Sequence, residues 1–150
     1  MTGIESLSRQ FVYLDANVFI YAVEDFPPFS DLCRVIFHMI DEGLFAAATS
    51  ELTLSEVLVG PFRDGNARAA KAYEDMLTER ARFTVEPVSR SVLYEAAQTR
   101  ATTGCRLPDA IHVTTARACK CDVILSADRR LKPPHGCRLL RLDQLKINKA

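Results

Sequence analysis

Four acidic side chains in this sequence lie within otherwise apolar segments. They are Asp15 in VYLDANVF, Glu56 in TLSEVLVG, Asp109 in RLPDAIHV and Asp128 in VILSADRR. A carboxylate in apolar surroundings is costly unless a hydrogen bond or a positive charge compensates it. One such residue can be explained as a helix cap, whereas four such residues suggest a shared function.

Carboxylates that are brought to one place repel each other, and their pKa values rise until some of them are protonated. A hard divalent cation removes this repulsion, and Mg²⁺ or Mn²⁺ prefers oxygen ligands and keeps several waters when it binds. Such a cation can activate a water, orient a phosphate and neutralise charge on a leaving oxygen. The four acids are therefore a candidate metal site that would suit the hydrolysis of phosphodiester bonds.

The sequence around these acids alternates between strand and helix patterns. Short runs of β-branched, aromatic or small apolar residues predict strands at residues 11–16, 45–49, 82–88, 121–128 and 137–142. Helical spacing of apolar residues predicts helices at residues 17–24, 30–43, 50–60, 65–80, 88–104 and 106–120. Ser30 is a possible cap of the second helix, and Gly60 with Pro61 is expected to end the third.

Strands that alternate with helices predict an α/β fold, a three-layer sandwich whose mainly parallel central sheet is flanked by helices. Ligands of such sheets gather at the carboxyl ends of the strands. Asp15 and Asp128 each end a predicted strand, so we expect both at the same edge of the sheet. Glu56 and Asp109 lie on predicted helices among apolar neighbours.

Length and composition predict one domain over residues 1–150, with 48% hydrophobic and 25% charged residues. No apolar run approaches the roughly 20 residues of a membrane span, and MTGIESLSRQF lacks the pattern of a secretory signal. We therefore expect a cytoplasmic protein without a membrane segment, whose five cysteines are reduced thiols. The CKC spacing at residues 119–121 is a poor match to a zinc knuckle.

Charge is distributed unevenly along the chain, although 19 basic and 19 acidic residues balance overall. Residues 100–150 carry 11 Lys and Arg against 4 Asp and Glu, whereas residues 1–99 carry 8 against 15. One interpretation is ordinary surface charge. The other is a basic surface for a polyanion beside an acidic pocket or partner surface.

The four acidic segments together resemble a known family. In chain order, LDANVFIY, TSELTLSEVL, LPDAIHVTTA and VILSADRRL resemble the four acidic motifs of PIN-domain nucleases, most closely the VapC-type toxins of prokaryotic toxin–antitoxin pairs. The resemblance extends from about residue 12 to residue 142. Each motif is weak alone, but four in order at compatible spacing are a specific signal.

The resemblance implies a role for each matching residue. Asp15, Glu56, Asp109 and Asp128 would be the catalytic, metal-binding acids. Asn17 would orient Asp15 or a bound water, and Ser126 would support the pocket by hydrogen bonding. Glu51 competes with Glu56 for the second motif, but it precedes the run LTLSEVL that carries the likeness, so Glu56 is preferred.

The resemblance also implies an activity and partners. The family cleaves RNA endonucleolytically with Mg²⁺ or Mn²⁺ as cofactor, and a metal-held water would attack phosphorus while a carboxylate takes its proton. Many members are homodimers, and a cognate antitoxin would be the inhibitory partner of this chain.

Basic residues beside the motifs give one departure and one further expectation. Arg129 and Arg130 stand where many relatives carry an acid or an aromatic residue after the fourth motif, which favours one metal over two. Arg106, Arg129, Arg130 and Lys132 are candidates for contacts to RNA phosphates, and solvated surface charge is the alternative for each. His112, three residues after Asp109, either joins the metal or a phosphate, or packs with one hydrogen bond; we favour the second.

Two other functions remain open from sequence. A haloacid-dehalogenase-type phosphohydrolase also begins with a strand-ending aspartate, but it needs a second aspartate where Asn17 stands, and a lysine motif that is not evident. A catalytically silent PIN-like module that binds RNA or protein is the non-enzymatic alternative. Retention of all four acids favours activity, because a silent relative has no chemical reason to keep them.

Overall fold

The structure is a computed structural model that describes residues 1–148, so the last two residues of the expected domain lie outside the described part. Five strands of this part form one sheet in the order β4-β3-β2-β5-β6, and every neighbouring pair is parallel. They are β2 (Phe11–Leu14), β3 (Ala46–Ser50), β4 (Phe83–Glu86), β5 (Val123–Ser126) and β6 (Arg138–Arg141). The predicted parallel sheet is thus confirmed.

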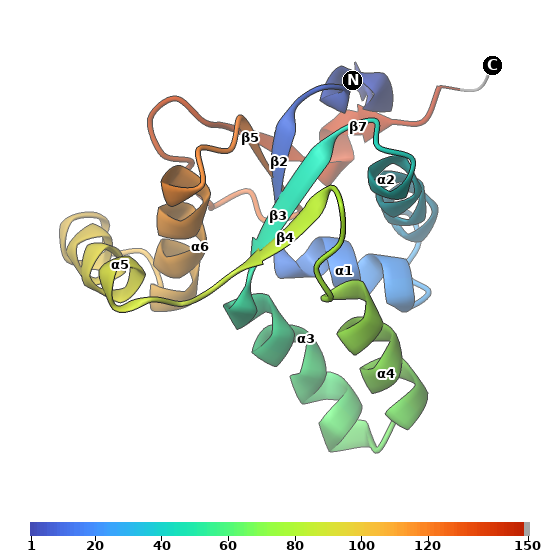
Figure 1. The fold of residues 1–150 in the computed structure, drawn as a ribbon, viewed down its shortest axis with the longest axis horizontal. Helices are drawn as coiled ribbons and strands as arrows, with labels where there is room; N and C mark the ends of the chain where they lie inside the picture. Colours follow the sequence, from blue (N-terminus) through green and yellow to red (C-terminus); the bar gives the residue numbers. More distant parts are fainter. Residues whose placement is uncertain (149–150) are drawn as a thin grey trace.

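Helices cover both faces of the sheet, with α5 and α6 on one side and α1, α2 and α4 on the other (Figure 1). The helices are α1 (Ala16–Val23), α2 (Ser30–Asp41), α3 (Glu51–Asp64), α4 (Ala67–Met76), α5 (Arg90–Thr103) and α6 (Leu107–Ala118). This arrangement confirms the predicted three-layer α/β sandwich. None of the helices within residues 1–148 has the length and apolar character to cross a membrane.

The core lies on both faces of the sheet because side chains alternate along each strand. In β2, Val12 and Leu14 pack into a core with α1, α2 and α4, whereas Tyr13 packs into a smaller core with α6. All three side chains are fully buried. Packing on both faces therefore fixes the position of β2, and with it the position of Asp15, which follows Leu14.

A small second sheet was not predicted. It pairs β1 (Thr2–Gly3) with β7 (Leu145–Lys146) in parallel, beside the 3-10 helices η1 (Ile4–Leu7) and η2 (Leu142–Gln144). Strands of two residues are too short for any periodic pattern to appear in the sequence.

Two predicted helix boundaries are wrong. Helix α3 does not end at Gly60 and Pro61 but continues to Asp64, and Gly65 closes it with φ +66°. Pro61 removes one backbone donor, yet its ring is buried, and its carbonyl accepts from the Asn66 N–H at 2.8 Å. Burial of Pro61 and the hydrogen bond from Asn66 thus offset the free-energy cost of a proline within the helix.

Ser30 is not the cap of α2. It is the first helical residue, the side chain of the capping residue Phe29 makes no hydrogen bond to the helix, and Ser30 itself is buried. By contrast, Ser50 does cap α3, since its hydroxyl accepts from the Leu52 N–H at 3.0 Å.

Candidate functional site

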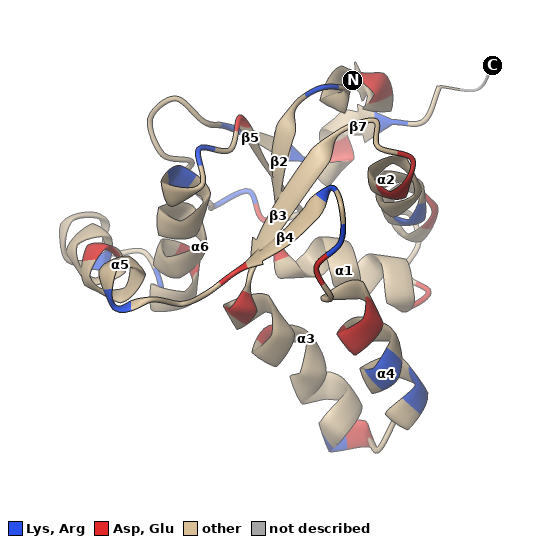
Figure 2. Ribbon diagram, in the orientation of Figure 1, with Lys and Arg blue, Asp and Glu red and all other residues tan. Residues whose placement is uncertain are grey.

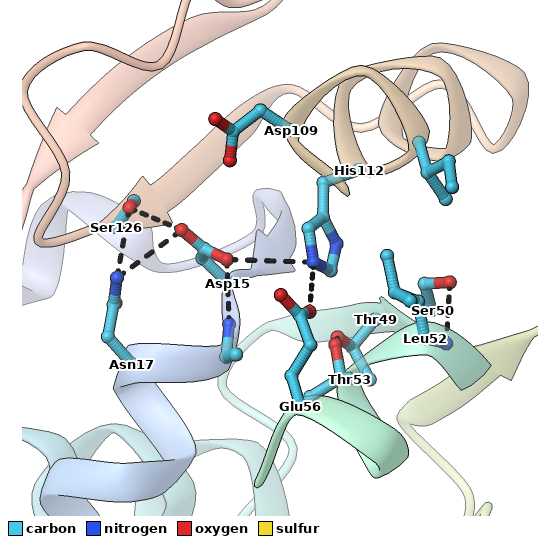
Figure 3. Close-up of polar contacts among 12 residues, drawn as sticks. Asp15, Asn17, Thr49, Ser50, Leu52, Thr53, Glu56, Asp109, His112 and Ser126 are labelled. Atoms are coloured by element: carbon cyan, nitrogen blue, oxygen red, sulfur yellow. Dashed lines mark hydrogen bonds and ion pairs between the residues drawn. The ribbon is translucent and has the colours of Figure 1, made fainter. Parts of the chain in front are cut away.

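Asp15 lies where β2 passes into α1, and its side chain is largely buried, with 13% exposed. As the cap of α1, it accepts from the Ala16 N–H through Oδ1 at 2.8 Å. Its other oxygen, Oδ2, accepts from the Ser126 hydroxyl at 2.6 Å and from Asn17 Nδ2 at 3.3 Å (Figure 3). Three donors therefore fix the orientation of this carboxylate.

Ser126 and Asn17 tie the end of β5 to the start of α1. The Ser126 hydroxyl is fully buried and accepts from the Asp128 N–H at 2.9 Å. Asn17 Oδ1 accepts from the Ala127 N–H at 3.1 Å, and Asn17 Nδ2 lies 3.3 Å from Ser126 Oγ. Both side chains thus hydrogen-bond to Asp15, and the functional roles that the resemblance implies for them stay predictions.

Asp128 lies two residues beyond β5 and is 19% exposed. Its Oδ1 accepts from the Arg130 N–H at 2.8 Å and from Arg130 Nε at 3.2 Å. Partial burial alone would raise the pKa of Asp128, but the hydrogen bonds and charge of Arg130 lower it below its ordinary value. The Asp128 carboxylate is therefore favoured in its ionised form.

Glu56 lies on α3, one turn after the buried Thr53, whose hydroxyl contacts that of Thr49 on β3. Thr49 donates to the Leu14 carbonyl at 2.8 Å, and the Thr49 and Thr53 hydroxyls lie 2.7 Å apart. This chain fastens the first turn of α3 to the end of β2. Because Glu56 follows Thr53 by three residues, it lies on nearly the same face of the helix and is directed toward Asp15 (Figure 3).

Asp109 lies in the first turn of α6, where Pro108 suits the helix start. Its side chain is 23% exposed, and Oδ2 accepts from Arg106 Nε at 3.2 Å. That hydrogen bond raises the pKa of Arg106, and the nearby charges of Asp128 and Glu56 raise it further. Arg106 is thus within electrostatic reach of three of the four acids.

His112 makes two side-chain contacts that the sequence did not reveal. Its side chain is 2% exposed, and Nε2 lies 2.5 Å from Glu56 Oε1 and 3.8 Å from Asp15 Oδ1. On the opposite side of the ring, Nδ1 lies 2.6 Å from the hydroxyl of Tyr13. The signals in the sequence were its spacing from Asp109 and its apolar neighbours, which suited a packed histidine equally well.

The environment of His112 is dominated by acids. Burial alone would lower the pKa of His112, but the hydrogen bond to Glu56 and the charges of Asp15, Glu56 and Asp109 raise it above its ordinary value. Geometry relates the four acids to one another. Asp15 and Glu56 both lie beside His112 Nε2, and Asp109 precedes His112 by one turn of α6. The N–H of Asp128 is bonded to Ser126, which also donates to Asp15. That these four acids form one functional site stays a prediction.

The donor chemistry of this region fits a hard divalent cation, because all four candidate ligands are carboxylates. Within residues 1–148, however, no group of three His, Cys, Asp or Glu side chains is arranged as a ready metal-binding set. Three of the acids are hydrogen-bonded to a basic side chain instead: Glu56 to His112, Asp109 to Arg106 and Asp128 to Arg130. Each of these carboxylates keeps a second oxygen that is not held at a short distance by its partner.

The four basic candidates differ in their surroundings. Arg106 and Arg130 pair with site acids, whereas Arg129 Nη2 lies 2.7 Å from Asp143 Oδ2. Lys132 lines a cavity of about 230 Å³ together with Asp109, between α6 and the 131–135 loop. Figure 2 marks Lys and Arg on several elements, among them α4, α5 and α6.

Comparison with known proteins identifies the class to which this fold and site belong. The sequence model of the PIN domain family matches residues 12–133. This match spans most of the chain and includes all four acids, and the chain therefore belongs to the PIN domain family. The family match also decides against the haloacid-dehalogenase-type alternative. A search of curated protein sequences finds no significant match.

Solved structures share the fold at low sequence identity. VapBC2 from Rickettsia felis, bound to a promoter DNA fragment, is 15% identical with a TM-score of 0.64, covering 87% of this chain and 98% of its own. A toxin–antitoxin complex from Klebsiella pneumoniae is 16% identical with a TM-score of 0.59, covering 84% and 94%. VapC20 from Mycobacterium tuberculosis, a sarcin-ricin loop cleaving toxin, is 15% identical with a TM-score of 0.63, covering 75% and 86%.

Proposed function

We propose that this PIN-domain protein is a metal-dependent endoribonuclease of the VapC type, the toxin of a toxin–antitoxin pair. The observation that supports the proposal is the position of His112 Nε2, 2.5 Å from Glu56 Oε1 and 3.8 Å from Asp15 Oδ1. Asp109 lies one turn earlier on the same helix, and Asp128 is bonded through its N–H to Ser126, which holds Asp15. The family match supports a nuclease, and four carboxylates are the donors that phosphodiester hydrolysis with Mg²⁺ or Mn²⁺ requires.

Asp15 is the best-prepared metal ligand, because Ser126 and Asn17 orient its carboxylate. Glu56, Asp109 and Asp128 would complete the set. When bound, the cation would supply an activated water and offset the charge on the leaving oxygen. Glu56 or another carboxylate would accept the proton of that water.

RNA is the proposed substrate. Arg106 and Arg130 hold site acids at present, and both are more than half exposed, so each can exchange its carboxylate for a substrate phosphate. Lys132 is exposed beside the same cavity as Asp109, while Arg129 is engaged by Asp143. Among the structural neighbours, VapC20 is described as cleaving the sarcin-ricin loop, which supports RNA as the substrate class.

The proposed partners are a second copy of the chain and an antitoxin. Two of the similar structures are toxin–antitoxin complexes, which supports an inhibitory partner for this chain. Light scattering during gel filtration tests the homodimer, and co-expression with the product of a neighbouring short gene tests the antitoxin.

The activity is tested by incubating the purified protein with total RNA and Mg²⁺ or Mn²⁺, beside the Asp15→Asn variant. Asparagine keeps an oxygen that can cap α1, so the variant retains its fold while losing a charged ligand. We expect discrete cuts from the parent that disappear with EDTA and in the variant. Equal cutting by both proteins would indicate a contaminating nuclease and would contradict the proposal.

A further inference from the structure

A buried chain of hydrogen bonds leads from the central strand to Glu56. The Tyr13 hydroxyl lies 2.6 Å from His112 Nδ1, and His112 Nε2 lies 2.5 Å from Glu56 Oε1. Tyr13 belongs to β2, His112 to α6 and Glu56 to α3, so the chain crosses three elements. We infer that His112, held by Tyr13, is a positioning residue that orients Glu56 toward the acidic site; this inference rests on the proposed nuclease function.

In the hydrogen bond between His112 and Glu56, the chemistry of the two side chains determines which one donates. An ionised carboxylate only accepts hydrogen bonds, so Nε2 of His112 must carry the hydrogen that it shares with Glu56. This holds for the neutral and for the charged imidazole, because Nδ1 can then accept from Tyr13 or donate to its oxygen. One oxygen of Glu56 is therefore occupied by His112. The other lies on the side of Asp15 (Figure 3).

The partners of the four acids differ in rigidity. Arg106 and Arg130, the partners of Asp109 and Asp128, have side chains that are 66% and 79% exposed. His112 is 2% exposed and packs edge-on to Tyr13, with ring centroids 5.7 Å apart. An arginine in solvent exchanges partners readily, whereas an enclosed imidazole with both nitrogens bonded does not.

This contrast divides the site into two halves. Asp15 and Glu56 already have fixed orientations, and His112 Nε2 lies within 3.8 Å of an oxygen of each. A glutamate on a helix otherwise samples several rotamers, and holding it in one before the cation arrives removes that entropic cost from binding. Asp109 and Asp128 form the half whose partners are exposed to solvent and can exchange. Loss of the His112 contact should therefore weaken metal binding through Glu56.

The test measures Mn²⁺ affinity by calorimetry without RNA, on the parent and on two matched variants. His112→Gln keeps an amide donor near the position of Nε2, whereas His112→Leu keeps a similar volume without any donor. Partners that orient metal ligands typically contribute about 10-fold or more to affinity. We expect His112→Leu to lose about 10-fold and His112→Gln to stay within about 3-fold of the parent.

A second comparison distinguishes the positioning of Glu56 by His112 from a purely structural role of His112. In a Glu56→Ala background, His112→Leu should change the Mn²⁺ affinity by less than about 2-fold, because His112 acts only through Glu56. Tyr13→Phe removes a single oxygen and should lower affinity in the same direction as His112→Leu. If His112→Leu does not fold, Tyr13→Phe and His112→Gln still give the comparison, with thermal unfolding as the control.

The outcomes distinguish this inference from the proposed function. Mn²⁺ binding and RNA cleavage by the parent, with Tyr13→Phe and His112→Leu binding Mn²⁺ as tightly as the parent, would overturn the positioning role alone. An equal loss in the parent and Glu56→Ala backgrounds would also overturn it. A folded parent that neither binds Mn²⁺ nor cleaves RNA would overturn the proposed function and this inference with it.

Discussion

The Ser126 hydroxyl donates a 2.6 Å hydrogen bond to Asp15 Oδ2, although 111 positions separate the two residues. Parallel pairing of β2 with β5 brings them together, since Leu14 is in register with Leu125. The next residue of each strand segment, Asp15 after Leu14 and Ser126 after Leu125, therefore lies at the carboxyl edge of the sheet, where ligands of parallel sheets bind. The orientation of Asp15 depends on this crossing between the first and last thirds of the chain.

Ser126→Ala should destabilise the protein and reduce its activity. The substitution removes the shortest donor to Asp15 and the acceptor of the Asp128 N–H, and buried groups left without partners cost about 1–3 kcal/mol. Urea unfolding measures the loss. Ser91→Ala, at an exposed position of α5, is the control and should change the free energy of unfolding by no more than about 0.5 kcal/mol. Equal effects of both substitutions would argue against the Ser126 contact.

Glu56→Gln should abolish most of the RNA cleavage, whereas Glu51→Gln should not. Glu56 contacts His112 beside Asp15, whereas Glu51 is exposed in the first turn of α3. Loss of a metal-binding or proton-accepting carboxylate lowers the rate by about 100-fold or more. Single-turnover cleavage rates with Mn²⁺ make the comparison. A larger loss in Glu51→Gln would reassign the second acidic position.

Arg106→Ala should weaken RNA binding and reduce its dependence on salt. A side chain that neutralises one phosphate contributes about one to the slope of log affinity against log salt concentration. Binding is measured with the Asp15→Asn background, which prevents cleavage during the titration. Arg68→Ala, an exposed cation on α4, is the control and should leave the slope unchanged. An unchanged slope in Arg106→Ala would remove this arginine from the RNA surface.

Cys119 should react with iodoacetamide before Cys33 and Cys137. The contact of its sulfur with that of Cys121, at 3.5 Å, lowers the pKa of Cys119, whereas burial raises the pKa of Cys33 to about 12 and of Cys137 to about 11. Since the thiolate is the nucleophile, a lower pKa gives faster labelling near pH 7 and a plateau at lower pH. Peptide mass spectrometry over a pH series measures the order. Earlier labelling of Cys137 would contradict it, and urea-unfolded protein is the control for equal access.

Much of the fold was predictable because strand and helix periods are local properties of the sequence. The buried run at β5 and the amphipathic pattern of α2 are examples, and both elements occur where they were expected. The end of α3 was not, because the burial of Pro61 and the closing turn at Gly65 outweigh the local effect of a Gly-Pro pair. Local sequence patterns therefore do not predict a helix end that is determined by tertiary packing.

The sequence predicts the candidate acids and two partners of Asp15, namely Asn17 and Ser126, but not the partner of Glu56. The hydrogen bond between Asp128 and Arg130 spans two residues, whereas the pairing of His112 with Glu56 joins two helices. No pattern along the chain encodes the second kind of contact, since it depends on how α3 and α6 dock. His112 therefore looked like a core residue until its neighbours were known.

The central claim, that the four acids form one cation site, is tested most directly by diffraction from crystals of the parent soaked in Mn²⁺. We predict an anomalous peak within about 2–2.5 Å of the Asp15 carboxylate, with Glu56, Asp109 or Asp128 also around it, and none in Asp15→Asn crystals. A peak held by other residues, or no peak in crystals of protein that cleaves RNA with Mn²⁺, would contradict the claim.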